Sequence, residues 1–231
     1  MPGRHYKEKS FAQTYHALVS REDYQGNLLG AIQAITPISD LNILELGAGT
    51  GRVTRLMAPL AKNLVATDLS YPMLKLAKEF LKDLDPPNWQ FIMADHHALP
   101  LKKNSVDLVI SGWSFHRVAA ESDKNWKIAV NTALSHIAQI LRPGGTILLI
   151  ESLGTGYEHP HPPEDVADYL AYLDRIGFNS RWIRTDYCFQ NLEEARALTS
   201  FFWGDVAFPF WETEEGVILP ECTGLWWKTL E

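Results

Sequence analysis

The sequence predicts an α/β fold with a doubly wound, mostly parallel sheet. Two observations indicate this class. Short continuous apolar runs alternate with amphipathic stretches along most of the chain, as in parallel sheets covered by helices on both faces. A glycine-rich turn directly follows the first apolar run, at the place where doubly wound sheets bind ligands. The 231 residues, 46% of them hydrophobic, suffice for one large domain with a buried core.

The elements can be assigned in chain order. Apolar spacing predicts a first helix over residues 11–35, which ends at Pro37. Buried strands are then expected at 42–46, 64–68, 89–94, 106–111 and 146–151. Helices are expected at 52–61, after the capping residue Ser70, and over 122–141, where a Pro-Gly-Gly sequence follows.

The last third of the chain has a different pattern. A helix is predicted over 164–176, a strand over 180–189, and a helix from Asn191, which forms a capping box with Glu194, to residue 202. A final strand is expected over 217–230, and Pro220 indicates that one of its ends or edges is unpaired. No repeats or clear linker are present, so we expect a single domain.

The turn after the first strand holds Gly47, Gly49 and Gly51. Glycine is costly in regular structure, so this density indicates positive φ angles or the close approach of another group. Asp68 ends the next strand, about 20 residues further on, where a carboxylate can accept hydrogen bonds from both hydroxyls of a ribose. The expected ligand is therefore a nucleoside derivative.

Two nucleoside cofactors share this geometry. A nicotinamide dinucleotide usually requires G-x-G-x-x-G, so that a helix N-terminus holds its pyrophosphate. Here the spacing is G-x-G-x-G, and Arg52 stands where the last glycine of that motif would be. S-adenosylmethionine has no phosphate and presents an amino acid, a sulfonium, a ribose and an adenine.

Four ordered segments resemble the class I S-adenosylmethionine-dependent methyltransferases, in particular the small-molecule enzymes of methyltransferase type 11. They are ILELGAGTGRVT, VATDLSYPML, MADHHALPLKKNSVDLVIS and LRPGGTILLIES, and together they cover about residues 40–152. The resemblance implies a Rossmann-like, seven-stranded sheet of order 3-2-1-4-5-7-6 with an antiparallel last strand. It divides the single domain of residues 1–231 into an N-terminal helical lid (1–37), a cofactor-binding half (38–152) and a substrate-side, antiparallel end (153–231).

The resemblance also implies roles for individual residues toward S-adenosylmethionine and its product S-adenosylhomocysteine. Glu45 would lie near the methionyl amino group, Asp68 would bind the ribose, and Asp95 would accept from the adenine amino group. The glycines of the turn would line the methionyl and ribose side, with Ser111 and Gly112 beneath the methionyl group. Leu69 and Met73 would pack on the adenine. His96 could offer its backbone N–H to the adenine ring, and Tyr15 could cover the cofactor mouth. The implied set is Glu45, Gly47, Gly49, Gly51, Asp68, Leu69, Met73, Asp95, His96, Ser111, Gly112 and Tyr15. For Met73 ordinary core packing, and for Tyr15 a place on a helix face, are open alternatives.

A general base is needed only if the acceptor atom carries a proton. His116 follows the fourth strand and titrates near neutral pH, so it is the first candidate; His97 and Glu151 are weaker ones. A role in a loop hydrogen bond is the alternative for His116. His159 and His161 lack a third ligand, so no metal is predicted.

The composition and net charge limit the kinds of partner that the protein is expected to bind. The net charge of −7 argues against a nucleic-acid footprint, and no apolar run is long enough to span a membrane. We expect a cytoplasmic monomer or homodimer that methylates an O, N or C atom of a small organic molecule. The alternatives are a nicotinamide-dependent oxidoreductase and a non-catalytic cofactor-binding protein with the same fold.

Overall fold

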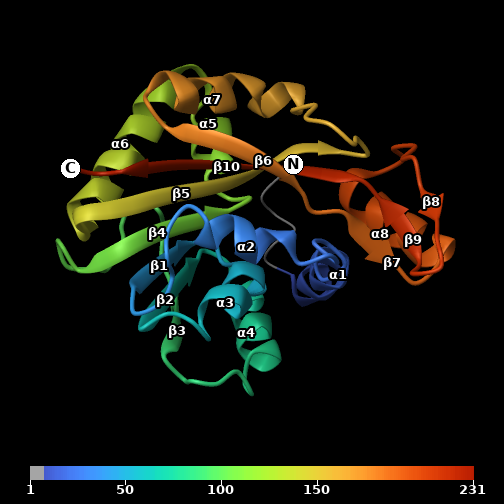
Figure 1. Ribbon diagram of the computed structural model, residues 1–231, viewed down its shortest axis with the longest axis horizontal. Helices are drawn as coiled ribbons and strands as arrows, with labels where there is room; N and C mark the ends of the chain where they lie inside the picture. The colour runs from blue at the N-terminus through green and yellow to red at the C-terminus, as the bar shows by residue number, and fades with distance from the viewer. Residues whose placement is uncertain (1–7) are drawn as a thin grey trace.

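A seven-stranded sheet forms the centre of the computed structural model, which describes residues 8–231 (Figure 1). Its strand order is β3-β2-β1-β4-β5-β10-β6. The strands are β1 (Asn42–Leu46), β2 (Asn63–Asp68), β3 (Trp89–Met93), β4 (Val106–Gly112), β5 (Leu141–Thr155), β6 (Asn179–Arg184) and β10 (Glu221–Thr229). Neighbours from β3 to β5 are parallel, whereas β10 runs antiparallel to both β5 and β6. The predicted fold class and sheet order are confirmed. Residues 1–7 of the predicted lid lie outside the described residues.

Helices cover both faces of this sheet because its strands are apolar on both sides. In β1, Ile43 packs into one buried cluster with α2 (Asn27–Gln33), α3 (Arg52–Met57) and α4 (Tyr71–Phe80). The next residue, Leu44, packs into the opposite cluster with α5 (His116–Ala120), α6 (Trp126–Ile140) and α7 (Glu164–Arg175). Figure 1 shows these two helical layers below and above the sheet. Successive side chains of one strand therefore pack against the helices on opposite faces of the sheet.

The predicted helix over 11–35 is wrong as a single element. The structure has two helices, α1 (Lys9–Val19) and α2, and the chain between them turns through Asp23 and Gly26, both with positive φ. The Asp23 carboxylate accepts hydrogen bonds from the backbone N–H groups of Asn27 and Leu28, at 2.8 and 3.1 Å. These bonds satisfy the otherwise unpaired donors at the start of α2 and so define a new helix start.

A second, three-stranded sheet of order β7-β9-β8 was not predicted. Its strands are β7 (Tyr187–Phe189), β8 (Trp211–Glu212) and β9 (Val217–Leu219), and α8 (Leu192–Trp203) packs beside it. Both late strands of the prediction are therefore divided between two sheets: β6 and β7 separate after Arg184, and β9 and β10 separate at Pro220. Proline has no N–H for a sheet ladder, so a break at Pro220 is consistent with its chemistry.

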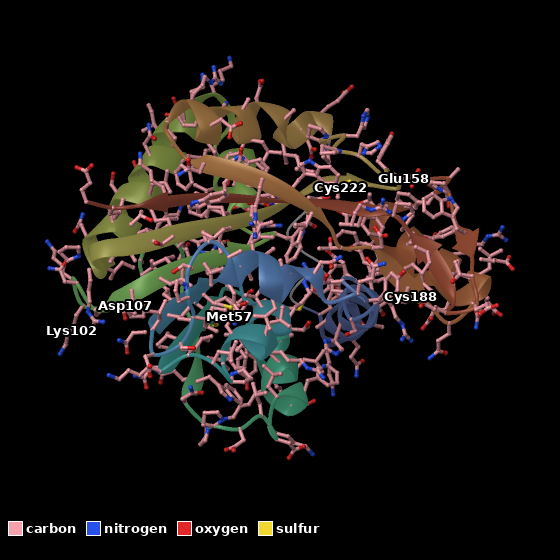
Figure 2. The ribbon with its side chains drawn as sticks, in the orientation of Figure 1. Met57, Lys102, Asp107, Glu158, Cys188 and Cys222 are labelled. Atoms are coloured by element: carbon pink, nitrogen blue, oxygen red, sulfur yellow. The ribbon has the colours of Figure 1, made fainter. Side chains whose placement is uncertain are left out.

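The two cysteines are free and lie apart, Cys188 on β7 and Cys222 on β10 (Figure 2). The Cys222 thiol donates to the carbonyl of Tyr157 at 3.3 Å. No helix within residues 8–231 has the length and apolar character needed to cross a bilayer.

Candidate functional site

The glycine-rich turn between β1 and α3 is crowded by neighbouring side chains. Gly47, Gly49 and Gly51 all have positive φ angles, of 68°, 55° and 85°. A Cβ on Gly47 would lie 1.9 Å from the Ser114 hydroxyl oxygen, and a Cβ on Gly49 would lie 3.6 Å from the Tyr15 ring. The turn therefore requires glycine for its backbone conformation, and at Gly47 also because another side chain occupies the space.

Asp68 ends β2 directly beside this turn. Its Oδ2 accepts the backbone N–H of Gly49 at 2.8 Å, and its Oδ1 accepts that of Ser70 at 2.7 Å. Burial raises the pKa of Asp68, and the two backbone hydrogen bonds oppose that effect. The carboxylate is thus fixed in orientation, and each oxygen keeps a lone pair for a ligand.

A cavity of about 320 Å³ opens at this edge of the sheet. Most of the residues that the family resemblance implies for the cofactor line it: Tyr15, Gly47, Gly49, Asp68, Leu69, Met73, Asp95, His96 and Gly112. Leu69 is 63% exposed although apolar, so its side chain is available to pack on a flat ring system. Met73 is 1% exposed and also belongs to a small core cluster with Ala12 and Leu76, so both of its expected roles have structural support.

Three implied cofactor residues do not line this cavity. Glu45 is buried beneath the turn and accepts a hydrogen bond from the Thr54 hydroxyl at 2.5 Å. Burial raises the pKa of Glu45 to about 7, with the hydrogen bond from Thr54 opposing the shift. Gly51 caps α3 and faces Leu81, and the Ser111 hydroxyl donates to the carbonyl of Leu46 at 3.2 Å. Glu45, Gly51 and Ser111 therefore lie beside or beneath the glycine-rich turn and not in the cavity lining.

A second cavity, of about 530 Å³, adjoins the first. Residues shared by both linings are Tyr15, Trp113, Arg117 and Glu121. Trp113 has φ of 51°, and its backbone N–H donates to the carbonyl of Ile150 at 2.7 Å. The Arg52 guanidinium lies 3.3 Å from the centre of the Trp113 ring, and Arg52 also pairs with the buried Glu22 carboxylate. Trp113 therefore borders both cavities and is held by its backbone hydrogen bond and by the Arg52 guanidinium.

His116 lines the second cavity at the start of α5, not a loop. Its Nδ1 lies 2.8 Å from Glu151 Oε2, and its backbone N–H donates to Glu151 Oε1 at 2.9 Å. Burial disfavours the imidazolium, but the charge and hydrogen bond of Glu151 outweigh burial and raise the pKa of His116. This pairing places the Nδ1 proton toward Glu151, so Nε2 remains as the acceptor.

Several lining residues were not predicted from the sequence. Arg117 and Glu121 form an i,i+4 ion pair at 2.7 Å on α5, a helix that the prediction lacked. Glu22 and Glu221 line the second cavity but come from an interhelical turn and from the start of β10. The i,i+4 spacing of Arg117 and Glu121 was a usable signal for a short helix. No sequence signal connected Glu22 with Glu221.

The first cavity fits S-adenosylmethionine better than a dinucleotide. Its lining contains the carboxylates Asp68, Asp95 and Glu121 but one guanidinium, that of Arg117, which pairs with Glu121. A pyrophosphate would be repelled there, whereas a sulfonium and an ammonium group would be attracted. Arg52, the residue that replaces the third glycine of the dinucleotide motif, lines the second cavity and pairs with Glu22.

Comparisons with known proteins agree with this geometry. Residues 44–149 match the family described as methyltransferase domain. The ubiquinone/menaquinone biosynthesis C-methyltransferase UbiE of Pseudomonas savastanoi is 27% identical over 160 residues, which cover 63% of this chain and 59% of the relative. The chain therefore spans less than two thirds of that relative's length.

Solved structures share the fold. An S-adenosylmethionine-dependent methyltransferase from Aquifex aeolicus has a TM-score of 0.58 and 14% identity, over 95% of this chain and 97% of its own. A Haemonchus contortus phosphoethanolamine N-methyltransferase, solved with S-adenosylhomocysteine, has a TM-score of 0.61 and 15% identity, over 98% of this chain and 59% of its own. Residues 44–149 thus match a methyltransferase domain, in agreement with the family predicted from the sequence, and the solved structures share its fold.

Proposed function

We propose that the protein transfers the methyl group of S-adenosylmethionine to an O, N or C atom of a small organic molecule held in the second cavity. The observation that carries this proposal is the pair of adjoining cavities, whose linings share Tyr15, Trp113, Arg117 and Glu121. One has the carboxylates and glycine turn suited to the cofactor, and the other contains the paired His116 and Glu151. Methyl transfer requires this arrangement of two ligands side by side.

The protein's own groups have distinct tasks in this reaction. The cofactor supplies the electrophilic methyl group when bound, so the chain chiefly positions the two ligands and excludes water. Asp68 orients the ribose, and Trp113, which borders both cavities, can contact both ligands. Where the acceptor atom is protonated, His116 Nε2 takes the proton, and Glu151 stabilises the resulting imidazolium.

Calorimetry with S-adenosylmethionine, S-adenosylhomocysteine and NAD tests the cofactor assignment. We expect the first two to bind and NAD not to bind. Binding of NAD alone would favour the oxidoreductase alternative. Release of S-adenosylhomocysteine during incubation with a panel of small metabolites then tests catalysis. Cofactor binding without turnover of any acceptor would favour the non-catalytic alternative.

Replacement of His116 tests its role as the base. His116→Ala should lower kcat by about 10²- to 10⁴-fold for a protonated acceptor. Affinity for S-adenosylhomocysteine should stay unchanged, because His116 lines the second cavity and not the first. His136→Ala on the exposed face of α6 is the matched control and should preserve turnover. Full activity of His116→Ala would show that no base acts at this position.

A further inference from the structure

The second cavity contains more carboxylates than its bases can neutralise. Acidic side chains in its lining are Glu22, Glu121, Glu151, Asp165 and Glu221, and the guanidinium groups are those of Arg52 and Arg117. Three of the acids have basic partners: Glu22 pairs with Arg52, Glu121 with Arg117, and Glu151 with His116. Glu221 is 1% exposed and forms no ion pair with any residue in the described part of the chain. None of the basic side chains in the described part of the chain therefore forms an ion pair with Glu221.

Glu221 is the first residue of β10, and hydrogen bonds hold both its backbone and its side chain. Its backbone N–H donates to Asp186 Oδ1 at 2.9 Å, and its carbonyl accepts the N–H of Thr185 at 3.0 Å. Its Oε1 accepts the Ser152 hydroxyl at 2.5 Å. Its Oε2 is buried and has no hydrogen-bond partner of normal geometry among residues 8–231. A buried acceptor without a donor is costly, and a ligand donor would remove that cost.

The charge around Glu221 favours a cation over a neutral donor. Burial and the negative charge of Glu22 raise the pKa of Glu221 to about 8. Hydrogen bonds from the Ser152 and Thr155 hydroxyls and the positive charge of Arg52 oppose this shift but do not outweigh it. Without a ligand, Glu221 is therefore mostly protonated near neutral pH. A positive group near Oε2 would shift it to the carboxylate, because it would offset both the burial and the repulsion from Glu22. An anionic acceptor would add to that repulsion, so the cavity disfavours carboxylates and phosphates.

Part of the lining is aromatic. Tyr15, Trp113, Tyr187, Phe202 and Trp203 all border the second cavity. Tyr187 and Trp203 meet edge to face, with ring centres 6.1 Å apart. These rings give an apolar body a surface to pack on and can also face a cation. The cavity thus combines acidic side chains with these five aromatic rings, which form its aromatic wall.

We propose that Glu221 is a specificity-determining residue that binds an ammonium group of the methyl acceptor, while the aromatic wall holds the acceptor's apolar or aromatic body. The acceptor class is therefore an organic amine. This assignment rests on the proposed function, because it takes the second cavity to be the acceptor site. The ammonium group anchors the molecule and need not be the atom that receives the methyl group.

Three probes of similar size but different charge test the assignment. They are 2-phenylethylamine, 2-phenylethanol and phenylacetate, titrated calorimetrically into the unaltered protein saturated with S-adenosylhomocysteine. We expect the amine to bind at least about tenfold more tightly than the alcohol, the scale of one charge-assisted hydrogen bond, and phenylacetate not to bind. Equal binding of the amine and the alcohol, or preferred binding of phenylacetate, would overturn the proposal.

Variants then assign the preference to Glu221. Glu221→Gln should abolish the preference for the amine and leave affinity for S-adenosylhomocysteine unchanged. Glu158→Gln is the control, since Glu158 is exposed and lies outside both cavity linings (Figure 2). Retained preference in Glu221→Gln would refute the role of this residue, and the probe series on the unaltered protein decides the acceptor class even if the variant does not fold. Failure of S-adenosylhomocysteine to bind would instead contradict the proposed function itself.

Discussion

At the scale of single residues, the carboxylate of Asp68 shows how the backbone prepares a binding group. Backbone N–H groups of Gly49 and Ser70 each occupy one lone pair of this carboxylate, on opposite oxygens. Since a carboxylate can accept about four hydrogen bonds, two positions remain for the hydroxyls of a ribose. The same residue therefore stabilises the turn and can recognise the sugar.

Replacing Asp68 by Asn tests that recognition. The amide keeps one acceptor oxygen but loses the charge, so we expect binding of S-adenosylhomocysteine to weaken by about 1–3 kcal/mol, measured by calorimetry. Asp107→Asn is the control because Asp107 pairs with Arg142 and lies outside the cofactor cavity. Unchanged affinity in Asp68→Asn would contradict the placement of the ribose.

The pair of His116 and Glu151 predicts a pH dependence of turnover. His116 acts as a base in its neutral form, so kcat should rise with pH through a pKa above the ordinary value of 6.5. Glu151→Gln removes the charge that raises this pKa, and the acidic limb of the profile should then shift to lower pH. A limb that stays in place in Glu151→Gln would mean that another group titrates.

At the scale of elements, the turn from β1 into α3 is limited by what lies against it. Gly47 and Gly26 have nearly equal φ angles, of 68° and 72°, but a Cβ on Gly26 would meet no atom within 4 Å, whereas one on Gly47 would meet Ser114. Gly26→Ala should therefore cost only backbone strain, about 1–2 kcal/mol. Gly47→Ala should cost more, because Ser114 must also move. Denaturant unfolding of both variants measures the difference, and equal losses would rule out crowding by Ser114.

The parallel core could be predicted from the sequence because its strands are continuous apolar runs bounded by clear turns. The strand arrangement in the last third of the chain could not be predicted from the sequence. Arg184 and Tyr187 lie close in sequence in one polar-aromatic run, and only the tertiary pairing assigns them to different sheets. The interruption of the first helix depends on Asp23 capping α2, a local bond that outweighs helical spacing.

The cofactor cavity could be anticipated more fully than the acceptor cavity. Asp68 and the glycine turn belong to one strand–turn–helix–strand segment, so spacing alone connects them. Glu22 and Glu221 stand about 200 residues apart, and their meeting depends on α1, β10 and the small sheet together. The place of Glu45 near the cofactor stays a prediction; in the structure its side chain accepts a hydrogen bond from Thr54 beneath the turn.

At the scale of the whole molecule, a buried acid couples folding to pH. The pKa of Glu45 is about 7 in the folded chain against an ordinary value of 4.5, because burial disfavours the carboxylate. Its contribution to the free energy of unfolding is present in full below the unfolded value and is lost as pH rises through the folded value. High pH should therefore weaken the fold through this residue.

Glu45→Gln isolates that effect because glutamine has similar size and no charge. Relative to this variant, the unaltered protein should lose up to about 3 kcal/mol of unfolding free energy between about pH 5 and about pH 8. Urea unfolding at several pH values, without cofactor, gives the comparison. Parallel pH dependences of the two proteins would show that Glu45 ionises normally in the fold.

Trp113, Tyr15, Arg117 and Glu121 border both cavities, and this common boundary has a thermodynamic consequence. An occupant of one cavity can contact the same side chains that an occupant of the other cavity meets. Each compound then alters the affinity of the other by an identical factor, as linkage demands. Under the proposed function, the dissociation constant of an acceptor should therefore differ between the protein bound to S-adenosylmethionine and the protein bound to S-adenosylhomocysteine.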